Sequence, residues 1–216
     1  MNKLLGKLKK YPTRDLLPYI ISNISDLVIL KFSNCLFLVN CIWHGIKINY
    51  GYKIWGKFCF RRFPGSEITI GNNFYAVCIP GRYSFNIFPQ SLMRTCSSTA
   101  RIIIGDDVGL NSIAIFCRSK KITIGDGTLI GGNCQITDND GHLLWPPHNR
   151  LLSPGLEFDK DVTIGRNVFI GLNVLILKGA VIGDNSVIAA GSVVKGHIPE
   201  NCLAAGVPAK IIHNYE

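Results

Sequence analysis

From Ile164 to Val194, an aliphatic residue recurs at every sixth position without a break. The residues in this series are Ile164, Ile170, Ile176, Ile182, Ile188 and Val194. Glycine follows directly after three of them, at 165, 171 and 183, and a small or β-branched residue follows four positions after each. Because helices repeat every 3.6 residues and plain strands every two, a period of six indicates a short strand joined to a turn.

Three such units close a triangular coil of about 18 residues, in which each inward side chain lies beneath its copy in the next coil. Ile170 is then expected to stack on Ile188, and Ile176 on Val194. The same register runs earlier through Ile104, Leu110 and Phe116, and it resumes at Ile124, Ile130 and Ile136, with a weaker copy from Ile70. Glycine and asparagine at the corners supply the backbone freedom that the turns need. We therefore predict an all-β fold, a parallel β-helix, over residues 46–213.

The basic charge of the chain is concentrated at its N-terminal end. Residues 1–62 hold 11 Lys and Arg but only two acidic residues, which accounts for the whole formal charge of +9. The remaining residues carry 12 charges of each sign. Because a nucleic-acid-binding protein usually spreads basic residues over its folded face, we expect no nucleic-acid partner.

The segment from Leu16 to Ile46 is the stretch most like a membrane helix. Polar residues interrupt it at Asn23, Asp26, Lys31, Asn34 and Asn40. A spanning helix needs about 20 nearly uninterrupted apolar residues, so we predict instead that residues 1–45 form a basic, apolar helical segment packed on the main domain or between subunits. The alternative is a monotopic membrane anchor whose basic residues face anionic headgroups. Those residues are Lys3, Lys7, Lys9, Lys10 and Arg14.

The eight cysteines form no C-x-x-C pair, which argues against a zinc knuckle. The basic start of the chain is not followed by a compact apolar run with a small-residue cleavage site, so we predict no cleavable signal peptide. We expect reduced, mostly buried thiols in a cytoplasmic protein. A peripheral place on the inner face of the cytoplasmic membrane is the alternative.

Three strings of residues are the most specific features of the sequence. They are Ile-Gly-Asp-Gly-Thr-Leu-Ile-Gly-Gly-Asn at 124–133, Asp-Asn-Asp-Gly-His at 138–142 and Ala-Gly-Val-Pro-Ala-Lys at 205–210. They resemble the hexapeptide-repeat acyltransferases, above all the maltose and galactoside O-acetyltransferases and the polysaccharide O-acetyltransferases, over residues 68–213. The resemblance implies a left-handed parallel β-helix, a homotrimer with active sites between subunits, and acetyl-CoA as the donor.

The resemblance implies two catalytic residues. His142 matches the family's catalytic histidine, and it lies six residues after Ile136, where the coil would place an aliphatic residue. A sugar hydroxyl is a weak nucleophile, and imidazole, with an unperturbed pKa of about 6.5, suits the removal of its proton. Asn111 matches an asparagine that helps to hold the tetrahedral intermediate, although asparagine also favours coil corners.

Four further residues are implied to contact acetyl-CoA. The backbone near Gly171 would meet the thioester, and the backbone of Ala190 would meet the pantetheine arm. Lys210 matches a basic residue near the adenosine and its 3′-phosphate. Lys195 lies beside the position of a second lysine, but its order with Gly196 differs from the family pattern.

Three departures from the family pattern leave the acceptor open. Leu143 replaces a proline, Leu172 replaces a small residue, and the acidic acceptor contact of the galactoside enzymes falls near Arg118 and Ser119. An active-site loop is predicted over residues 143–161, where the six-residue register is lost. Within it, Trp145 either stacks against a sugar or anchors the loop.

The sequence is thus interpreted as an O-acetyltransferase that moves an acetyl group from acetyl-CoA directly to a hydroxyl of a sugar or glycan, without an acyl-enzyme. The alternatives are an N-acetyltransferase for an amino sugar and a non-catalytic scaffold. We expect no metal, because no other histidine repeats in coil register with His142 as the zinc site of a γ-type carbonic anhydrase would require.

Overall fold

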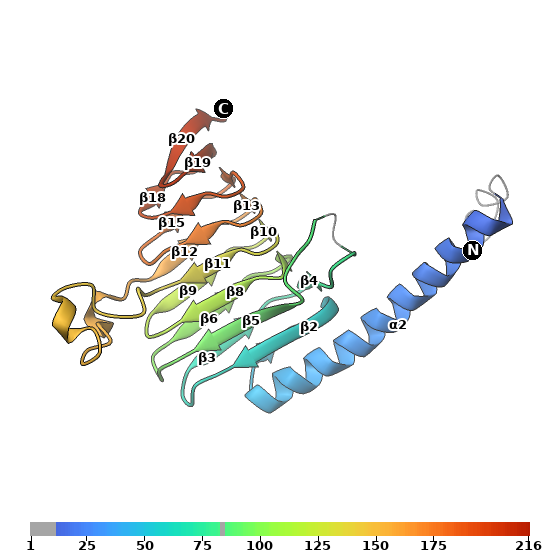
Figure 1. Cartoon of the computed structure of the whole chain (residues 1–216), viewed down its shortest axis with the longest axis horizontal. Coiled ribbons are helices and arrows are strands. Elements are labelled where there is room, and N and C mark those ends of the chain that lie inside the picture. Colours follow the sequence, from blue (N-terminus) through green and yellow to red (C-terminus); the bar gives the residue numbers. More distant parts are fainter. Residues whose placement is uncertain (1–11, 83–84) are drawn as a thin grey trace.

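The computed structural model describes residues 12–82 and 85–216, and Lys3, Lys7, Lys9 and Lys10 lie outside them. The chain winds as a parallel β-helix with three flat faces, and one long helix, α2 (Thr13–His44), lies across its N-terminal end (Figure 1). The predicted fold class, a left-handed parallel β-helix with an N-terminal helix, is confirmed.

The first face is a parallel sheet of seven strands that follow one another along the β-helix. They are β1 (Lys47–Ile48), β3 (Glu67–Ile70), β6 (Arg101–Ile104), β9 (Lys121–Ile124), β12 (Val162–Ile164), β15 (Val181–Ile182) and β18 (His197–Ile198).

The other two faces meet in strand β2 (Lys53–Arg61), which bends around the corner between them and pairs with β4 on one side and β5 on the other. The second face continues through β4 (Tyr75–Cys78), β7 (Gly109–Asn111), β10 (Leu129–Ile130), β13 (Phe169–Ile170), β16 (Val187–Ile188) and β19 (Cys202–Gly206), and ends in the antiparallel β20 (Ala209–Asn214). The third face holds β5 (Gln90–Thr95), β8 (Ala114–Cys117), β11 (Gln135–Thr137), β14 (Leu175–Ile176) and β17 (Val193–Val194).

The core is a set of aliphatic ladders inside the three faces. Ile170 pairs in register with Ile188, and Ile176 with Val194, as the period of six predicted. All four side chains are fully buried. Stacked aliphatic side chains form the interior, and each coil supplies the hydrogen-bond partners of the next strand edge.

Phe116 does not stand in the ladder where the sequence pattern placed it. Ile115 pairs with Ile136 and with Met93 and is buried, whereas Phe116 lies outside with the Arg94 guanidinium 5.6 Å above its ring. The corner after Leu110 is therefore one residue shorter than the repeat, and Ser112 turns it with a φ of 46°. The shift follows from the shorter corner and not from the size of the side chain, because Phe60 is buried in the same ladder two coils earlier.

One face of helix α2 packs on the open edge of the first coil, which confirms the predicted contact with the main domain. Phe37 and Cys41 are buried there, and the Phe37 ring lies 5.5 Å from that of Phe58. Ser33 Oγ accepts the N–H of Gly56 at 2.9 Å, and Asn34 Oδ1 accepts the N–H of Ile54 at 2.8 Å. Polar side chains within the apolar segment thus accept the backbone N–H groups that β2 presents at its open edge. Gly45, with a φ of 60°, ends the helix.

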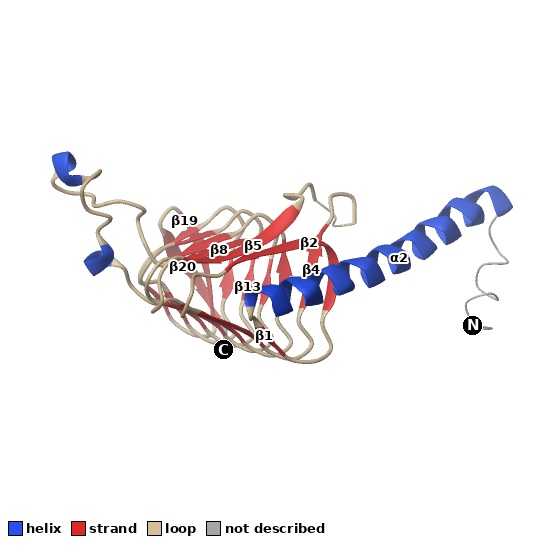
Figure 2. Cartoon of the chain, turned by 90° about the horizontal axis from the view of Figure 1, so that it is seen from below, coloured by secondary structure: helices blue, strands red, loops and turns tan. Residues whose placement is uncertain are grey.

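One long loop leaves the β-helix between β11 and β12 and projects from its side (Figures 1 and 2). It contains the short 3₁₀ turns η1 (Pro147–Asn149) and η2 (Leu156–Phe158). The loop begins at Asp138, directly after β11, rather than at residue 143 as predicted. His142 therefore lies inside the loop and is exposed, not at an inward position of the coil.

Candidate active site

The three corners of each coil stack into three edges that run along the β-helix, and two of them carry the predicted site residues. The edge between the second and third faces is called the Asn111 edge, because Asn111 ends β7 there. The edge between the third and first faces is called the His142 edge, because the loop that holds His142 leaves it. The edge between the first and second faces carries a ladder of Asp and Asn side chains.

The His142 ring is oriented by the backbone of its own loop. Its Nδ1 lies 3.2 Å from the carbonyl oxygen of Arg150. Because a carbonyl oxygen only accepts hydrogen bonds, Nδ1 carries the proton of this bond, and the neutral ring presents a free lone pair at Nε2. This is the tautomer that a general base requires.

A cavity of about 210 Å³ opens beside His142. It is lined by Asp140, His142, Leu143, Leu144, Trp145, Phe158 and Lys178. Lys178 forms an ion pair with Asp140, and its ammonium lies 6.0 Å from the Phe158 ring centroid. The cavity thus combines apolar and aromatic walls with one acidic and one basic group, a composition suited to a sugar-sized ligand.

Asp138, the first residue of the loop, ties the loop to the preceding corner. Its carboxylate accepts the backbone N–H groups of Arg118 at 2.7 Å, Ser119 at 3.0 Å and Lys120 at 2.9 Å. The Asn139 side chain also donates to Asp138, and Asn139 Oδ1 accepts the N–H of Gly141. The backbone that leads to His142 is therefore held at each step.

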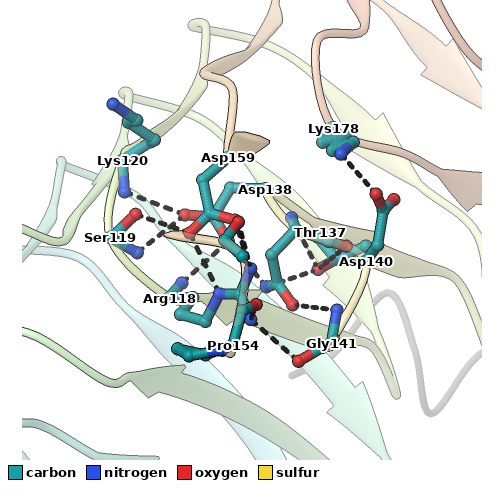
Figure 3. A network of polar contacts seen from close by, with 12 residues as sticks. Arg118, Ser119, Lys120, Thr137, Asp138, Asp140, Gly141, Pro154, Asp159 and Lys178 are labelled. Atoms are coloured by element: carbon teal, nitrogen blue, oxygen red, sulfur yellow. Dashed lines mark hydrogen bonds and ion pairs between the residues drawn. The ribbon is translucent and has the colours of Figure 1, made fainter. Parts of the chain in front are cut away.

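Arg118 closes the loop from the other side (Figure 3). Its Nε and Nη2 donate to the Asp159 carboxylate at 3.0 and 2.5 Å, and its Nη1 donates to the carbonyls of Gly141 at 2.8 Å and Pro154 at 2.6 Å. A fifth bond reaches the Gly155 carbonyl, so every guanidinium N–H has an acceptor. Hydrogen bonding to Asp159 raises the pKa of Arg118.

The buried guanidinium thereby fixes the residue before His142 together with both ends of the loop. Ser119 adds a bond from its hydroxyl to Asp159 at 2.5 Å. The two positions at which the resemblance places an acidic acceptor contact therefore serve the loop instead. Nothing in the repeat links Arg118 with Asp159, which stand 41 residues apart, so sequence reasoning missed this network.

On the Asn111 edge, Asn111 itself is almost fully buried. Its Nδ2 donates to the carbonyl of Ile130 at 3.3 Å, while its Oδ1 has no hydrogen-bond partner within the described residues. A buried amide oxygen without a partner is costly and marks a place where a ligand donor fits.

Glycines bring the turns above Asn111 close together on this edge. A Cβ on Gly171 would come within 2.6 Å of the Ala190 nitrogen, so glycine alone allows the two turns to stack this closely. Lys210 lies at the C-terminal end of the same edge, where it pairs with Ala205 across the β19–β20 hairpin. A column with few side chains and a lysine at its end suits an extended, anionic ligand.

A single chain does not bring all predicted site residues together. Asn111, Gly171 and Ala190 follow one another along the Asn111 edge, whereas His142 and Lys195 lie on the His142 edge. Lys195 is exposed there directly after β17, on the same side as Lys178. Sequence reasoning did not single out Lys178, which follows the aliphatic corner residue Leu177.

Other nucleophiles and metal ligands are not assembled in the part of the chain that the structure describes. All eight cysteines are free, and burial raises the pKa of Cys41 to about 12 and of Cys134 to about 11, so both remain thiols. Among the described residues, no group of three His, Cys, Asp or Glu side chains is placed to hold a metal ion.

Two family models match the chain. The bacterial transferase hexapeptide repeat matches residues 161–196, and the hexapeptide repeat of succinyl-transferase matches residues 121–141. These are the coils on either side of the projecting loop, so the loop itself is an insertion between two runs of the repeat.

Two curated Escherichia coli K12 proteins are similar in sequence. WbbJ, named for an inferred role as a lipopolysaccharide biosynthesis O-acetyl transferase, is 39% identical over 120 residues, which cover 53% of this chain and 61% of that protein. The galactoside O-acetyltransferase is 38% identical over 148 residues, which cover 68% and 54%. The chain thus spans between half and two thirds of the length of these relatives.

The fold recurs in a solved structure of the N-acyltransferase AntD of Bacillus cereus. That structure aligns with a TM-score of 0.58 at 17% identity, over 79% of this chain and 83% of that one. The chain therefore carries hexapeptide repeats of the transferase type over residues 121–141 and 161–196, is similar in sequence to O-acetyl transferases, and shares the β-helix fold of a solved N-acyltransferase.

Proposed function

We propose that the chain transfers an acetyl group from acetyl-CoA to a hydroxyl of a sugar or glycan, with His142 as the general base. The observation that carries the proposal is the His142 ring, held through Nδ1 with Nε2 free beside a cavity of sugar size. The named activities of the two similar Escherichia coli proteins, both O-acetyl transferases, support the choice of reaction.

The reaction follows from the free lone pair on His142. As the acceptor oxygen attacks the thioester carbonyl, a C–O bond forms and Nε2 takes the hydroxyl proton. The tetrahedral intermediate collapses, the C–S bond breaks, and the imidazolium returns the proton to the CoA thiolate. No side chain needs to carry the acetyl group when both substrates are bound together.

The Asn111 edge fits the donor. Backbone groups beside Gly171 and Ala190 would line the pantetheine arm, and Lys210 would meet the charge of the nucleotide end. The Asn111 amide stands at the base of this column, where the second N–H of its Nδ2, beyond the one donated to Ile130, would stabilise negative charge that develops on the thioester oxygen.

Because His142 and Asn111 occupy different edges, we propose that the complete site forms between two copies of the chain. The His142 edge of one copy would face the Asn111 edge of the next. An interface that joins two different surfaces closes into a ring when its rotation allows, and three copies in such a ring would form the homotrimer that the resemblance implies.

The test is the loss of the base. His142→Ala should lower kcat for CoA release by about 10²–10⁴, while the affinity for acetyl-CoA stays near that of the wild type. His148→Ala, an exposed histidine in the same loop, is the matched control and should retain full activity. Full activity in His142→Ala would contradict the mechanism.

The acceptor class is decided by a panel of substrates. CoA release from acetyl-CoA with neutral sugars, glycans and amino sugars should be fastest with a hydroxyl acceptor. Acetylation confined to amines would instead assign the chain as an N-acetyltransferase, and no release with any acceptor would favour a scaffold.

A further inference from the structure

The outer side of helix α2 carries an apolar stripe that nothing in the described residues covers. The stripe consists of Leu17, Ile21, Ile24, Val28, Leu38 and Ile42, called the outer stripe here. All six side chains are exposed, with fractions between 39% and 73%. Their spacing of three, four or seven residues places them on one side of the helix, apart from a ten-residue interval that holds Lys31 and Cys35.

The outer stripe faces away from the β-helix. Ser33, Phe37 and Cys41, on the opposite side of the same helix, are buried against the first coil. Nearer the N-terminus, Asp26 also turns toward the body, where it forms an ion pair with Arg82. Figures 1 and 2 show α2 below the first coil, with its N-terminal half running out beyond β2.

The outer stripe is long and, apart from the interval that holds Lys31, apolar. From Leu17 to Ile42 it extends for roughly 38 Å at the rise of an α-helix. Asn23 and Ser25 return their side-chain donors to the helix backbone at 2.7 Å, which lowers the cost of apolar surroundings. A soluble surface rarely exposes so continuous a patch without a partner.

By length and composition alone, residues 14–44 would also suffice to cross a membrane. Packing argues against a span, because the C-terminal half of α2 is held by Phe37, Cys41 and the bonds of Ser33 and Asn34 to β2. The part of α2 before Asp26, residues 14–25, is about 18 Å long and too short for a hydrocarbon core of about 30 Å.

Charge distinguishes a lipid surface from a second copy of the chain. Before Asp15 the sequence carries five basic residues and no acidic one, and Lys31 adds a positive charge within the stripe. Anionic headgroups complement this charge, whereas pairing two such helices side by side in the same direction would bring like charges together.

We propose that α2 lies in the plane of an anionic lipid surface, with its outer stripe buried in the headgroup and acyl boundary and the β-helix standing on it. This inference does not rest on the proposed acetyl transfer. It makes the protein a monotopic membrane protein whose N-terminal end faces the bilayer.

The test is co-sedimentation of the full chain with vesicles of phosphatidylcholine containing phosphatidylglycerol, beside vesicles of phosphatidylcholine alone. Wild-type protein should bind the anionic vesicles more tightly, and salt should weaken the binding. The double variant Ile24→Glu/Val28→Glu should bind at least about tenfold more weakly, since each buried aliphatic side chain contributes that factor or more. Tyr19→Glu, an exposed residue on the other side of the same helix, should bind like the wild type.

Three results would overturn the proposal: no binding of the wild type to anionic vesicles, equal loss in Tyr19→Glu, or unchanged binding in the double variant. Light scattering without lipid addresses the rival occupant. If the double variant has a smaller mass than the wild type, a second copy covers the stripe and the proposal fails. Acetyl transfer to a soluble acceptor should be equal in both proteins, which separates this result from the proposed function.

Discussion

At the scale of single residues, Arg118 is the side chain on which the geometry around His142 depends. It joins the carbonyl of Gly141 to the carboxylate of Asp159, so it holds the start and the end of the loop at once. Both Arg118 and Asp159 are buried. Removal of one member of such a pair leaves the other charged and without compensation in a poorly solvated place.

Arg118→Met should therefore lower the free energy of unfolding by about 3–5 kcal/mol. Arg118→Lys keeps the charge beside Asp159 but loses several of the carbonyl bonds. In that variant we expect a lower kcat with an unchanged KM for acetyl-CoA, because the base is displaced and the donor column is not. Urea unfolding and steady-state kinetics measure the two effects.

Arg166→Met is the matched control. Arg166 also pairs with an aspartate, Asp184, but its side chain is 68% exposed. The same substitution there should cost less than about 1 kcal/mol and leave kcat unchanged. Equal effects at the two arginines would refute a positioning role for Arg118.

At the scale of elements, the edge between the first and second faces shows how one corner stabilises the next. The carboxylate of Asp106 accepts the backbone N–H of Asn72, and that of Asp184 accepts the N–H of Arg166. These backbone bonds are the main reason that the pKa of each aspartate is lowered. Each ionised carboxylate thus ties two coils together.

The lowered pKa values predict an acid limit to stability. A carboxyl whose pKa is lower in the folded state stabilises the protein above its unfolded pKa, and the contribution is lost as the pH falls through the folded value. Stability should therefore decline as the pH drops below about 4. Asp184→Asn should show a shallower decline in urea midpoint between pH 5 and pH 3, whereas Glu157→Gln, in the projecting loop, should follow the wild type.

The elements also show what the sequence could predict. A fixed period marks the inward-facing residues Ile170, Ile176, Ile188 and Val194. The ladders and the β-helix could therefore be predicted directly from the sequence. The corner after Leu110 breaks the period by one residue, so Ile115 rather than Phe116 faces the interior, and nothing in the repeat predicts this shift.

The candidate site was less predictable for a related reason. His142 was found through a resemblance in a string of residues, not through the repeat. The loop around it is positioned by contacts between residues far apart in the chain, such as Asp138 with the corner at Arg118. No periodic signal records such contacts, so Arg118 was interpreted only as a departure from the family pattern.

At the scale of the whole molecule, the two edges that hold the candidate site predict the behaviour of the assembly. Light scattering should give about three times the chain mass of 23.8 kDa. Each site would then draw His142 from one chain and the donor column from its neighbour. A chain without His142 and a chain with a damaged donor column should therefore complement each other within one trimer.

Mixed trimers test the shared site. Chains with His142→Ala should be inactive alone, and so should chains with Gly171→Val, in which the new side chain collides with Ala190. Unfolding and refolding the two together should restore a fraction of the wild-type rate of CoA release. A mixture that stays inactive, or an active monomer, would rule out the shared site.

Helix α2 covers the open edge of the first coil, and this affects whether another molecule can pair with that end of the β-helix. A stack of parallel coils is its own template, because a bare terminal strand offers the same backbone groups that another molecule uses to lengthen a fibre. Ser33 and Asn34 occupy these groups on β2, and at the far end the antiparallel β20 reverses the strand direction of the second face. Helix α2 thus also blocks strand pairing at the first coil, and a chain without this helix would be exposed to end-to-end polymerisation.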